Sequence, residues 1–117
     1  MDKIQGRAFL ADRAWSGPRI ATIPDAVVKL RWTDTPFQWH ANTGEEVFVV
    51  LDGAVDMHVR GPQGEERIVP LESGDILHLV EGEEHRAHPR GPARVLVVEQ
   101  ATRPRADPLN REAHPAP

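Results

Sequence analysis

Turn-forming residues constrain this chain most, because they recur too often to leave room for long helices. Nine glycines and eleven prolines are spread over 117 residues. Short runs rich in β-branched and aromatic residues lie between them, and 46–51 is the clearest. The Asp-Gly pair that follows this run, at 52–53, favours a tight hairpin. We therefore expect short strands joined by tight turns.

The alternation of apolar runs and turns predicts an all-β chain folded as a small antiparallel β-barrel. About eight short strands at nearly regular spacing are typical of β-sandwiches and barrels. One short helix is expected within residues 4–14, where Phe9, Leu10 and Arg13 would lie near one helical face. The strands are expected at residues 19–23, 26–32, 36–39, 46–51, 54–60, 66–69, 76–80 and 93–99.

These elements divide the chain into three parts. Residues 1–20 are expected to form an N-terminal arm, and residues 21–100 the barrel domain. Residues 101–117 are rich in Pro, Arg and Ala and are expected to form a flexible C-terminal tail. No internal repeat and no linker between two domains is present, so the sequence predicts one domain.

Composition argues against several classes of function. The formal net charge is −4 and the isoelectric point about 5.8, whereas nucleic-acid binding relies on a basic surface. No stretch has the roughly 20 apolar residues of a membrane-spanning helix. The N-terminus is polar and lacks the apolar core of a signal peptide. With no cysteine, thiolate chemistry is excluded. We therefore expect a cytoplasmic protein that binds neither nucleic acid nor membranes.

Two histidines and one glutamate are the candidate functional residues. His40 ends a predicted strand, Glu46 begins the next one, and His85 follows the turn at Gly82 one strand pair later. Because a small closed barrel points alternate residues inward, these three side chains are expected to meet in its interior. Two imidazoles and one carboxylate form a facial ligand set that leaves coordination positions open and suits Fe(II) and related divalent ions.

Two segments resemble the sequence motifs of the cupin family. The first, 39–53, is similar to the motif His-x-His, three or four residues, Glu, six residues, Gly, with His40 and Glu46 in place. The second, 74–85, resembles Gly, five residues, Pro-x-Gly, two residues, His, and ends on His85. The resemblance covers most of the chain and is nearest to small single-domain cupins described as mannose-6-phosphate-isomerase-like. It implies a β-barrel of jelly-roll type.

The resemblance also implies a metal site. Cupins typically hold a divalent ion with three histidines and one glutamate, which places His40, Glu46 and His85 as ligands of Fe, Mn, Zn or Ni. Two positions depart from the motifs, since Asn42 stands in place of the remaining histidine and Val80 in place of the proline. An amide oxygen binds these metals more weakly than imidazole does. Asn42 is therefore expected to coordinate weakly, to hold a water or only to line the pocket.

Other properties follow from the resemblance in the same way. Small cupins usually pair, which implies a homodimer, and an arm such as residues 1–20 can add a strand to a neighbour's sheet edge. The partner implied for the interior is a small polar organic molecule. If the chain is an enzyme, the resemblance implies a metal-dependent dioxygenase or isomerase, with no catalytic residue assigned.

The interior is expected to be a mostly apolar pocket. Phe48, Val50 and Met57 are expected to line it, with His78 in its wall. Two other interpretations stay open. In one, the three candidate ligands form a buried polar cluster without metal, and the barrel binds a small molecule through side chains such as Asn42. In the other, the apolar side chains simply fill the barrel, which then serves as a structural or interaction module.

Overall fold

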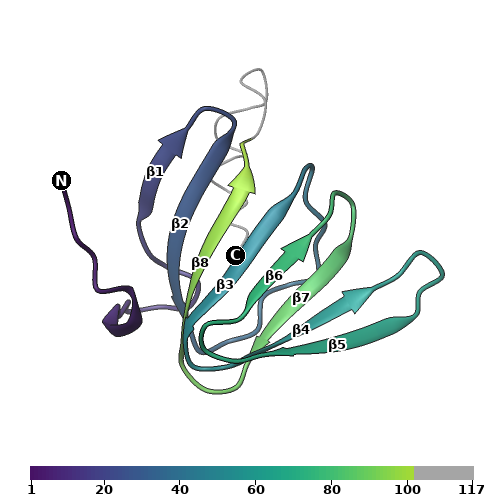
Figure 1. Cartoon of the computed structure of the whole chain (residues 1–117). Coiled ribbons are helices and arrows are strands. Elements are labelled where there is room, and N and C mark those ends of the chain that lie inside the picture. The colour runs from purple at the N-terminus through teal and green to yellow at the C-terminus, as the bar shows by residue number, and fades with distance from the viewer. Residues whose placement is uncertain (102–117) are drawn as a thin grey trace.

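A computed structural model describes residues 1–101, and most of their regular structure is β-strand (Figure 1). The predicted all-β class with a short N-terminal helical segment is confirmed. The predicted C-terminal tail lies, from residue 102 onward, outside the described residues. In chain order the elements are the 3-10 helix η1 (Gly6–Ala8) and the strands β1 (Arg19–Ile23), β2 (Ala26–Thr33), β3 (Glu46–Asp52), β4 (Val55–Arg60), β5 (Glu66–Leu71), β6 (Ile76–Leu79), β7 (Glu84–Pro89) and β8 (Ala93–Gln100).

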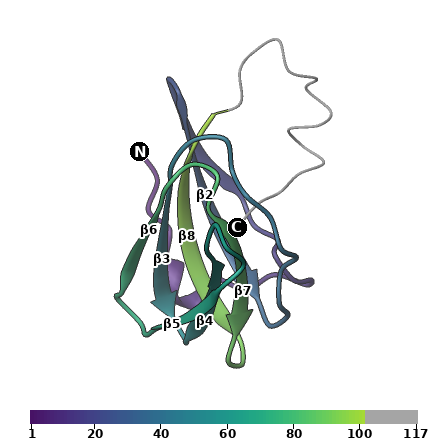
Figure 2. The ribbon, with the colours of Figure 1, turned by 90° about the vertical axis from the view of Figure 1, so that its right-hand side faces the viewer.

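The strands form two antiparallel sheets that lie as two layers (Figures 1 and 2). One sheet has five strands in the order β1-β2-β8-β3-β6, and the other has three in the order β5-β4-β7. Strands distant in sequence are neighbours, since β8 lies between β2 and β3. Within the described residues 1–101, no helix is long and apolar enough to cross a membrane.

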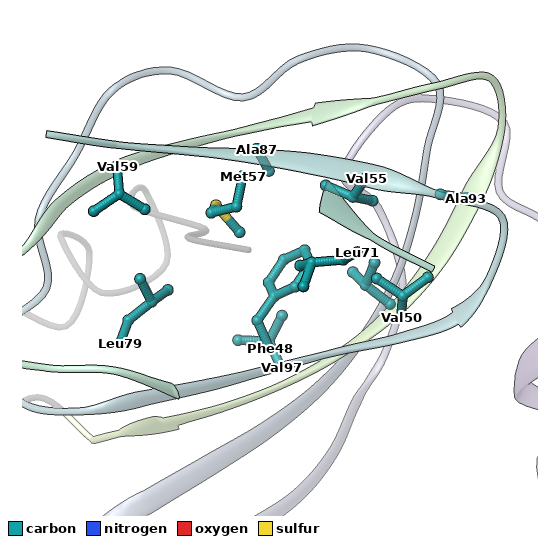
Figure 3. Close-up of a cluster of buried hydrophobic side chains, with 11 residues drawn as sticks. Phe48, Val50, Val55, Met57, Val59, Leu71, Leu79, Ala87, Ala93 and Val97 are labelled. Atoms are coloured by element: carbon teal, nitrogen blue, oxygen red, sulfur yellow. The ribbon is translucent and has the colours of Figure 1, made fainter. Parts of the chain in front are cut away.

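The core lies between the two sheets (Figure 3). Alternate residues of β3 and β4 point into it, because successive side chains of a strand face opposite sides of its sheet. Phe48, Val50 and Met57, which were predicted to line a pocket, are fully buried and pack into this core with Val55. They therefore fill the space between the layers at this level.

The N-terminal segment is less helical than predicted. Only Gly6–Ala8 is helical, as a single 3-10 turn, and Phe9 continues in an extended conformation. The side chain of Arg94 holds this extended segment, because its Nε donates to the Phe9 carbonyl at 2.7 Å. A short helix is marginal by itself, so contacts with the rest of the fold decide the conformation here.

The predicted strand at 36–39 does not form, which corrects the sequence analysis. The segment runs beside β7 and pairs with it only intermittently, through a hydrogen bond from Phe37 N to Ala87 O and a single bridge between His40 and His85. Pro36 lacks the N–H group that a continuous ladder needs. The segment therefore covers the edge of β7 as a loop, and it ends on His40.

Candidate metal centre

Three side chains from both sheets converge at one end of the interior. Glu46 is the first residue of β3 in the five-stranded sheet, and His85 is the second residue of β7 in the three-stranded sheet. His40 lies opposite His85, and the two exchange backbone hydrogen bonds of 3.1 and 2.9 Å. One donor atom from each side chain lies within 4.8 Å of the other two. The structure thus brings together the three residues chosen from the sequence.

The strand alternation of β3 directs Glu46 inward. Glu46 is 1% exposed, as part of the buried row that continues through Phe48 and Val50. Its neighbour Glu45 points to the opposite side, where 70% of its side chain is exposed. Two adjacent glutamates therefore have different roles, because only one of them reaches the interior.

Backbone contacts fix the orientation of both imidazoles. His40 Nδ1 lies 3.0 Å from the carbonyl oxygen of Gln38, and His85 Nδ1 lies 2.9 Å from that of Glu83. A carbonyl oxygen only accepts, so in each ring Nδ1 carries the proton and donates. When the ring is neutral, the lone pair is then on Nε2, which is the tautomer that a metal ligand requires.

Three buried polar atoms at this point have no hydrogen-bond partner within residues 1–101. They are His40 Nε2, Glu46 Oε2 and His85 Nε2. His85 Nε2 lies 3.3 Å from Glu46 Oε1, which is close enough for an ion pair, but the approach does not make a hydrogen bond. Buried polar atoms without partners are rare in folded proteins because they are costly. A cation bound by all three would satisfy them together, so the residues present fit a metal ion.

Asn42 contacts the carboxylate of Glu46. Its side-chain Nδ2 donates to Glu46 Oε1, the oxygen on the other side of the carboxylate from the unpartnered Oε2. Its backbone carbonyl accepts a hydrogen bond of 3.1 Å from Gly82 N, which ties the loop before β3 to the turn before β7. Asn42 therefore orients the carboxylate of a candidate ligand, and the donors that converge are two histidines and one glutamate.

The two histidines differ in their preferred charge. Burial lowers the pKa of His40, so this imidazole is neutral at physiological pH. For His85, burial disfavours the charged form, but the contact with Glu46 outweighs it and the pKa is raised. Metal binding needs both rings neutral, so a cation replaces the proton that Glu46 favours on His85.

The remaining histidines of the described chain lie elsewhere. His78 does not line the interior, because it pairs with Val47 on the outward-facing side of β3 and β6. Its Nε2 lies 2.6 Å from Glu45 Oε1, and 53% of its side chain is exposed. His58 and His88 stack on the outer face of the three-stranded sheet, with ring centroids 4.0 Å apart. None of these joins the centre.

The His58–His88 stack predicts a pH dependence of stability. Burial, followed by the charges of His58 and Arg86, lowers the pKa of His88. The unfolded chain, where His88 has its ordinary pKa near 6.5, therefore takes up the proton more readily than the folded chain. The stability contributed by neutral His88 is therefore complete above pH 6.5 and is lost as the pH falls below it. Urea unfolding at several pH values should show that the free energy of unfolding of the His88→Gln variant rises relative to that of the original chain as the pH is lowered from 7 to 5. A constant difference would contradict the prediction.

The sequence analysis missed three charged residues on the same inner face. Lys29, Arg31 and Glu99 are buried or nearly so, and the register of β2 with β8 puts them in line with the core rows. A signal was present, since Lys29 and Arg31 alternate with apolar residues in a predicted strand and Glu99 ends another. That alternation gives no indication of which face becomes the interior.

Comparison with known protein families shows which family this chain belongs to. Residues 30–99, which contain all three converging side chains, match the family model of the cupin domain. The chain belongs to the cupin family. Comparison of this cupin with curated proteins gives no significant match.

Several solved structures have a fold similar to that of this chain. A cupin-2 domain protein from Shewanella frigidimarina NCIMB 400 is 24% identical, with a TM-score of 0.68 over 78% of this chain and 85% of that one. Hydroquinone 1,2-dioxygenase from Sphingomonas sp. TTNP3, solved with 4-hydroxybenzoate, is 20% identical, with a TM-score of 0.70 over 79% of this chain and 29% of that one. Bacillus subtilis oxalate decarboxylase, described with Mn(II) centres, is 15% identical, with a TM-score of 0.61 over 66% and 21%. At these identities the likeness establishes the fold that this cupin shares with them.

Proposed function

We propose that this cupin binds one divalent transition-metal ion through His40, Glu46 and His85 and uses it to hold a small polar organic ligand. The observation that supports this most is the convergence of three buried donor atoms without hydrogen-bond partners in the described chain. The contacts of both Nδ1 atoms with backbone carbonyls favour, in the neutral rings, the tautomer that a ligand requires. A bound ion would supply a Lewis acid that polarises the ligand.

The donor set favours a first-row transition metal over Mg²⁺ or Ca²⁺. Two imidazole nitrogens and one carboxylate suit Fe(II), Mn(II), Zn(II) and Ni(II), whereas Mg²⁺ and Ca²⁺ prefer oxygen ligands. Three protein donors leave coordination positions for water or a ligand. A protein of similar structure described with Mn(II) centres supports this choice, and another solved with 4-hydroxybenzoate bound supports a small organic ligand. The homodimer that the resemblance to small cupins implied is a separate expectation, and it stays a prediction.

Metal titration tests the proposal. After dialysis against a chelator, the protein is expected to bind one equivalent of at least one of these ions at micromolar concentration, by calorimetry and elemental analysis. At an ion concentration 100 times the Kd, unfolding should cost about 2.7 kcal/mol more. His40→Ala should lose this binding. His78→Ala is the matched control, since it removes an exposed imidazole outside the centre. Equal binding by both variants, or no binding by the original chain, would refute the site.

The contact between Asn42 and Glu46 predicts a smaller effect. Asn42→Ala removes the hydrogen bond that orients the carboxylate while leaving all three donors in place. Side chains that hydrogen-bond to a metal ligand without binding the metal themselves typically contribute about 10–100-fold to metal affinity. We expect a loss of about tenfold in the same titration, with one equivalent still bound at saturation. Unchanged affinity would show that the orientation of Glu46 does not depend on Asn42.

A further inference from the structure

His40 lies outside the strands, whereas the other two candidate ligands lie within them. Glu46 belongs to β3 and His85 to β7, and ladders with neighbouring strands hold the backbone of both. In the described chain, the segment before His40 pairs with β7 through one hydrogen bond of Phe37 and the bridge at His40. A segment with so few backbone bonds opens easily, so other contacts must fix the position of His40.

A row of rings leads from the N-terminal arm to the candidate metal centre. The rings of Trp15 and Phe37 pack edge to face, with centroids 5.3 Å apart and planes at 72°. Phe37 contacts the imidazole of His40 in the same way, at 5.0 Å and 79°. The His40 ring in turn lies 4.3 Å from the ring of His85. Edge-to-face contacts are directional, so this row restricts the orientation of the His40 ring.

Two side-chain hydrogen bonds hold the same segment. The indole Nε1 of Trp15 donates to the carbonyl oxygen of Thr35 at 2.8 Å. The Nε of Arg86, in β7, donates to the carbonyl oxygen of Phe37 at 2.7 Å. Both acceptors belong to the segment that ends on His40. Trp15 therefore holds this segment in two ways, by its ring and by its indole N–H group.

The backbone of Trp15 is itself strained and anchored. Its φ is 57°, in the left-handed region that bulky residues rarely adopt. The N–H group of Trp15 donates to the Trp32 carbonyl at 2.8 Å, and Ser16 forms a bridge with Trp32. Strained residues persist only where the surrounding structure determines them, and they cluster at functional sites. The arm is thus fixed to β2 at the residue whose ring reaches the segment before His40.

Core packing alone explains these features less well. Trp15 packs against the core cluster but is only partly buried, as is Phe37. An aliphatic side chain in an ordinary conformation could cover the core at this point. It would need neither a left-handed backbone nor a hydrogen bond to the Thr35 carbonyl. Both features have a clearer role if they hold the segment that carries His40.

We infer that Trp15 and Phe37 are positioning residues, which hold the imidazole of His40 toward the candidate metal centre before an ion binds. The inference rests on the proposed function for the ion and adds how one of its ligands is kept in place. A donor that is already ordered loses less conformational entropy on binding, so the affinity for the ion is higher. Sites whose supporting residues are lost typically bind metal about 10–100-fold more weakly.

Calorimetry on the full-length protein with Fe(II), Mn(II), Zn(II) and Ni(II) in turn is the first test. Phe37→Leu removes the ring contact with His40 and keeps an apolar side chain. It should lower ion affinity about tenfold, with one equivalent still bound at saturation. Trp15→Leu should lower the affinity severalfold. Since both residues act on one segment, the double variant should lose less than the product of the two single effects.

Trp39→Leu is the matched control. Trp39 is adjacent to His40 in sequence, but the guanidinium of Arg60 lies over its ring, 3.9 Å from the centroid. The substitution therefore removes a neighbouring aromatic ring that does not belong to the row ending on His40. It should leave ion affinity unchanged.

Amide hydrogen exchange of the metal-free protein separates positioning from general stability. The amide of His40 donates to the His85 carbonyl at 3.1 Å, so its exchange rate reports opening of the segment. Phe37→Leu and Trp15→Leu should each raise this rate severalfold. Leu71→Val, a truncation in the core, should raise the exchange rates of amides in β8 but not that of His40.

The outcomes separate the two proposals. If the original chain binds an ion and both variants bind it as tightly, the inference is wrong and the metal site stands. If the variants bind more weakly but exchange at His40 is unchanged, the inference is also wrong, because the loss does not arise from that segment. If no ion binds but exchange at His40 rises in the two variants, the metal proposal fails and the positioning of His40 stands.

Discussion

His85→Ala is expected to lower the affinity of this cupin for a divalent ion by at least about a hundredfold. The substitution removes a donor atom itself, so the loss should exceed the roughly 10–100-fold that an outer partner contributes. It also removes one of only three side chains whose donor atoms converge in the described chain. Calorimetric titration of the chelator-treated variant measures the change, and elemental analysis reports the ion retained after purification.

Glu45→Gln is the matched control for the charge at the centre. Glu45 is adjacent to Glu46 in sequence but exposed on the outer side, so its replacement should leave ion affinity unchanged. Glu46→Gln, which neutralises the buried carboxylate, should behave like His85→Ala. If the two glutamate variants bind the ion equally, the carboxylate of Glu46 is not a ligand and the proposed centre is wrong.

Phe48→Ala is expected to lower the free energy of unfolding by about 3–5 kcal/mol, measured by urea denaturation of the metal-free protein. Phe48 is fully buried between the sheets, where it packs with Val97, Met57 and Leu71 (Figure 3). Truncation leaves a cavity that a rigid pair of sheets cannot close. Small domains are stable by only about 5–15 kcal/mol, so this loss approaches the whole stability of the fold.

Ile76→Ala provides the comparison for Phe48. Ile76 also lies in the five-stranded sheet, but it is 67% exposed, so its truncation should change stability by only about 0.5 kcal/mol. Equal losses for the two variants would show that Phe48 is not part of a packed core. That result would favour the original prediction that Phe48 lines an open pocket.

The fold was predictable because its signals are local. The alternation of Glu46, Phe48 and Val50 gives the inward face of β3. The Asp-Gly pair at 52–53 does turn the chain between β3 and β4, but these strands lie in different sheets, so the hairpin predicted there does not form. The predicted strand at 36–39 failed for a reason that is not local. Whether that segment pairs depends on where the edge of β7 lies, and a window of four residues contains no information about it.

Only those residues of the candidate centre that follow from the spacing of the motifs were predicted from the sequence. The spacing brought together His40, Glu46 and His85, which the structure places in contact range. The role of Asn42 depends on a side-chain rotamer, so the sequence left three alternatives for it. Lys29 was missed because its place beside Glu99 results from the pairing of β2 with β8, which are separated by most of the chain.

The origin of the three donors has a mechanical consequence. Glu46 belongs to one layer, whereas His85, with His40 bridged to it, belongs to the other. Any cation held by all three is therefore a cross-link between the layers, in a chain that has no cysteine to make a covalent one. Chelation would remove this cross-link and leave that end of the sandwich joined by packing, by the His85–Glu46 ion pair and by the hydrogen bond from Gly82 N to Asn42 O, so loss of the ion would loosen the two layers.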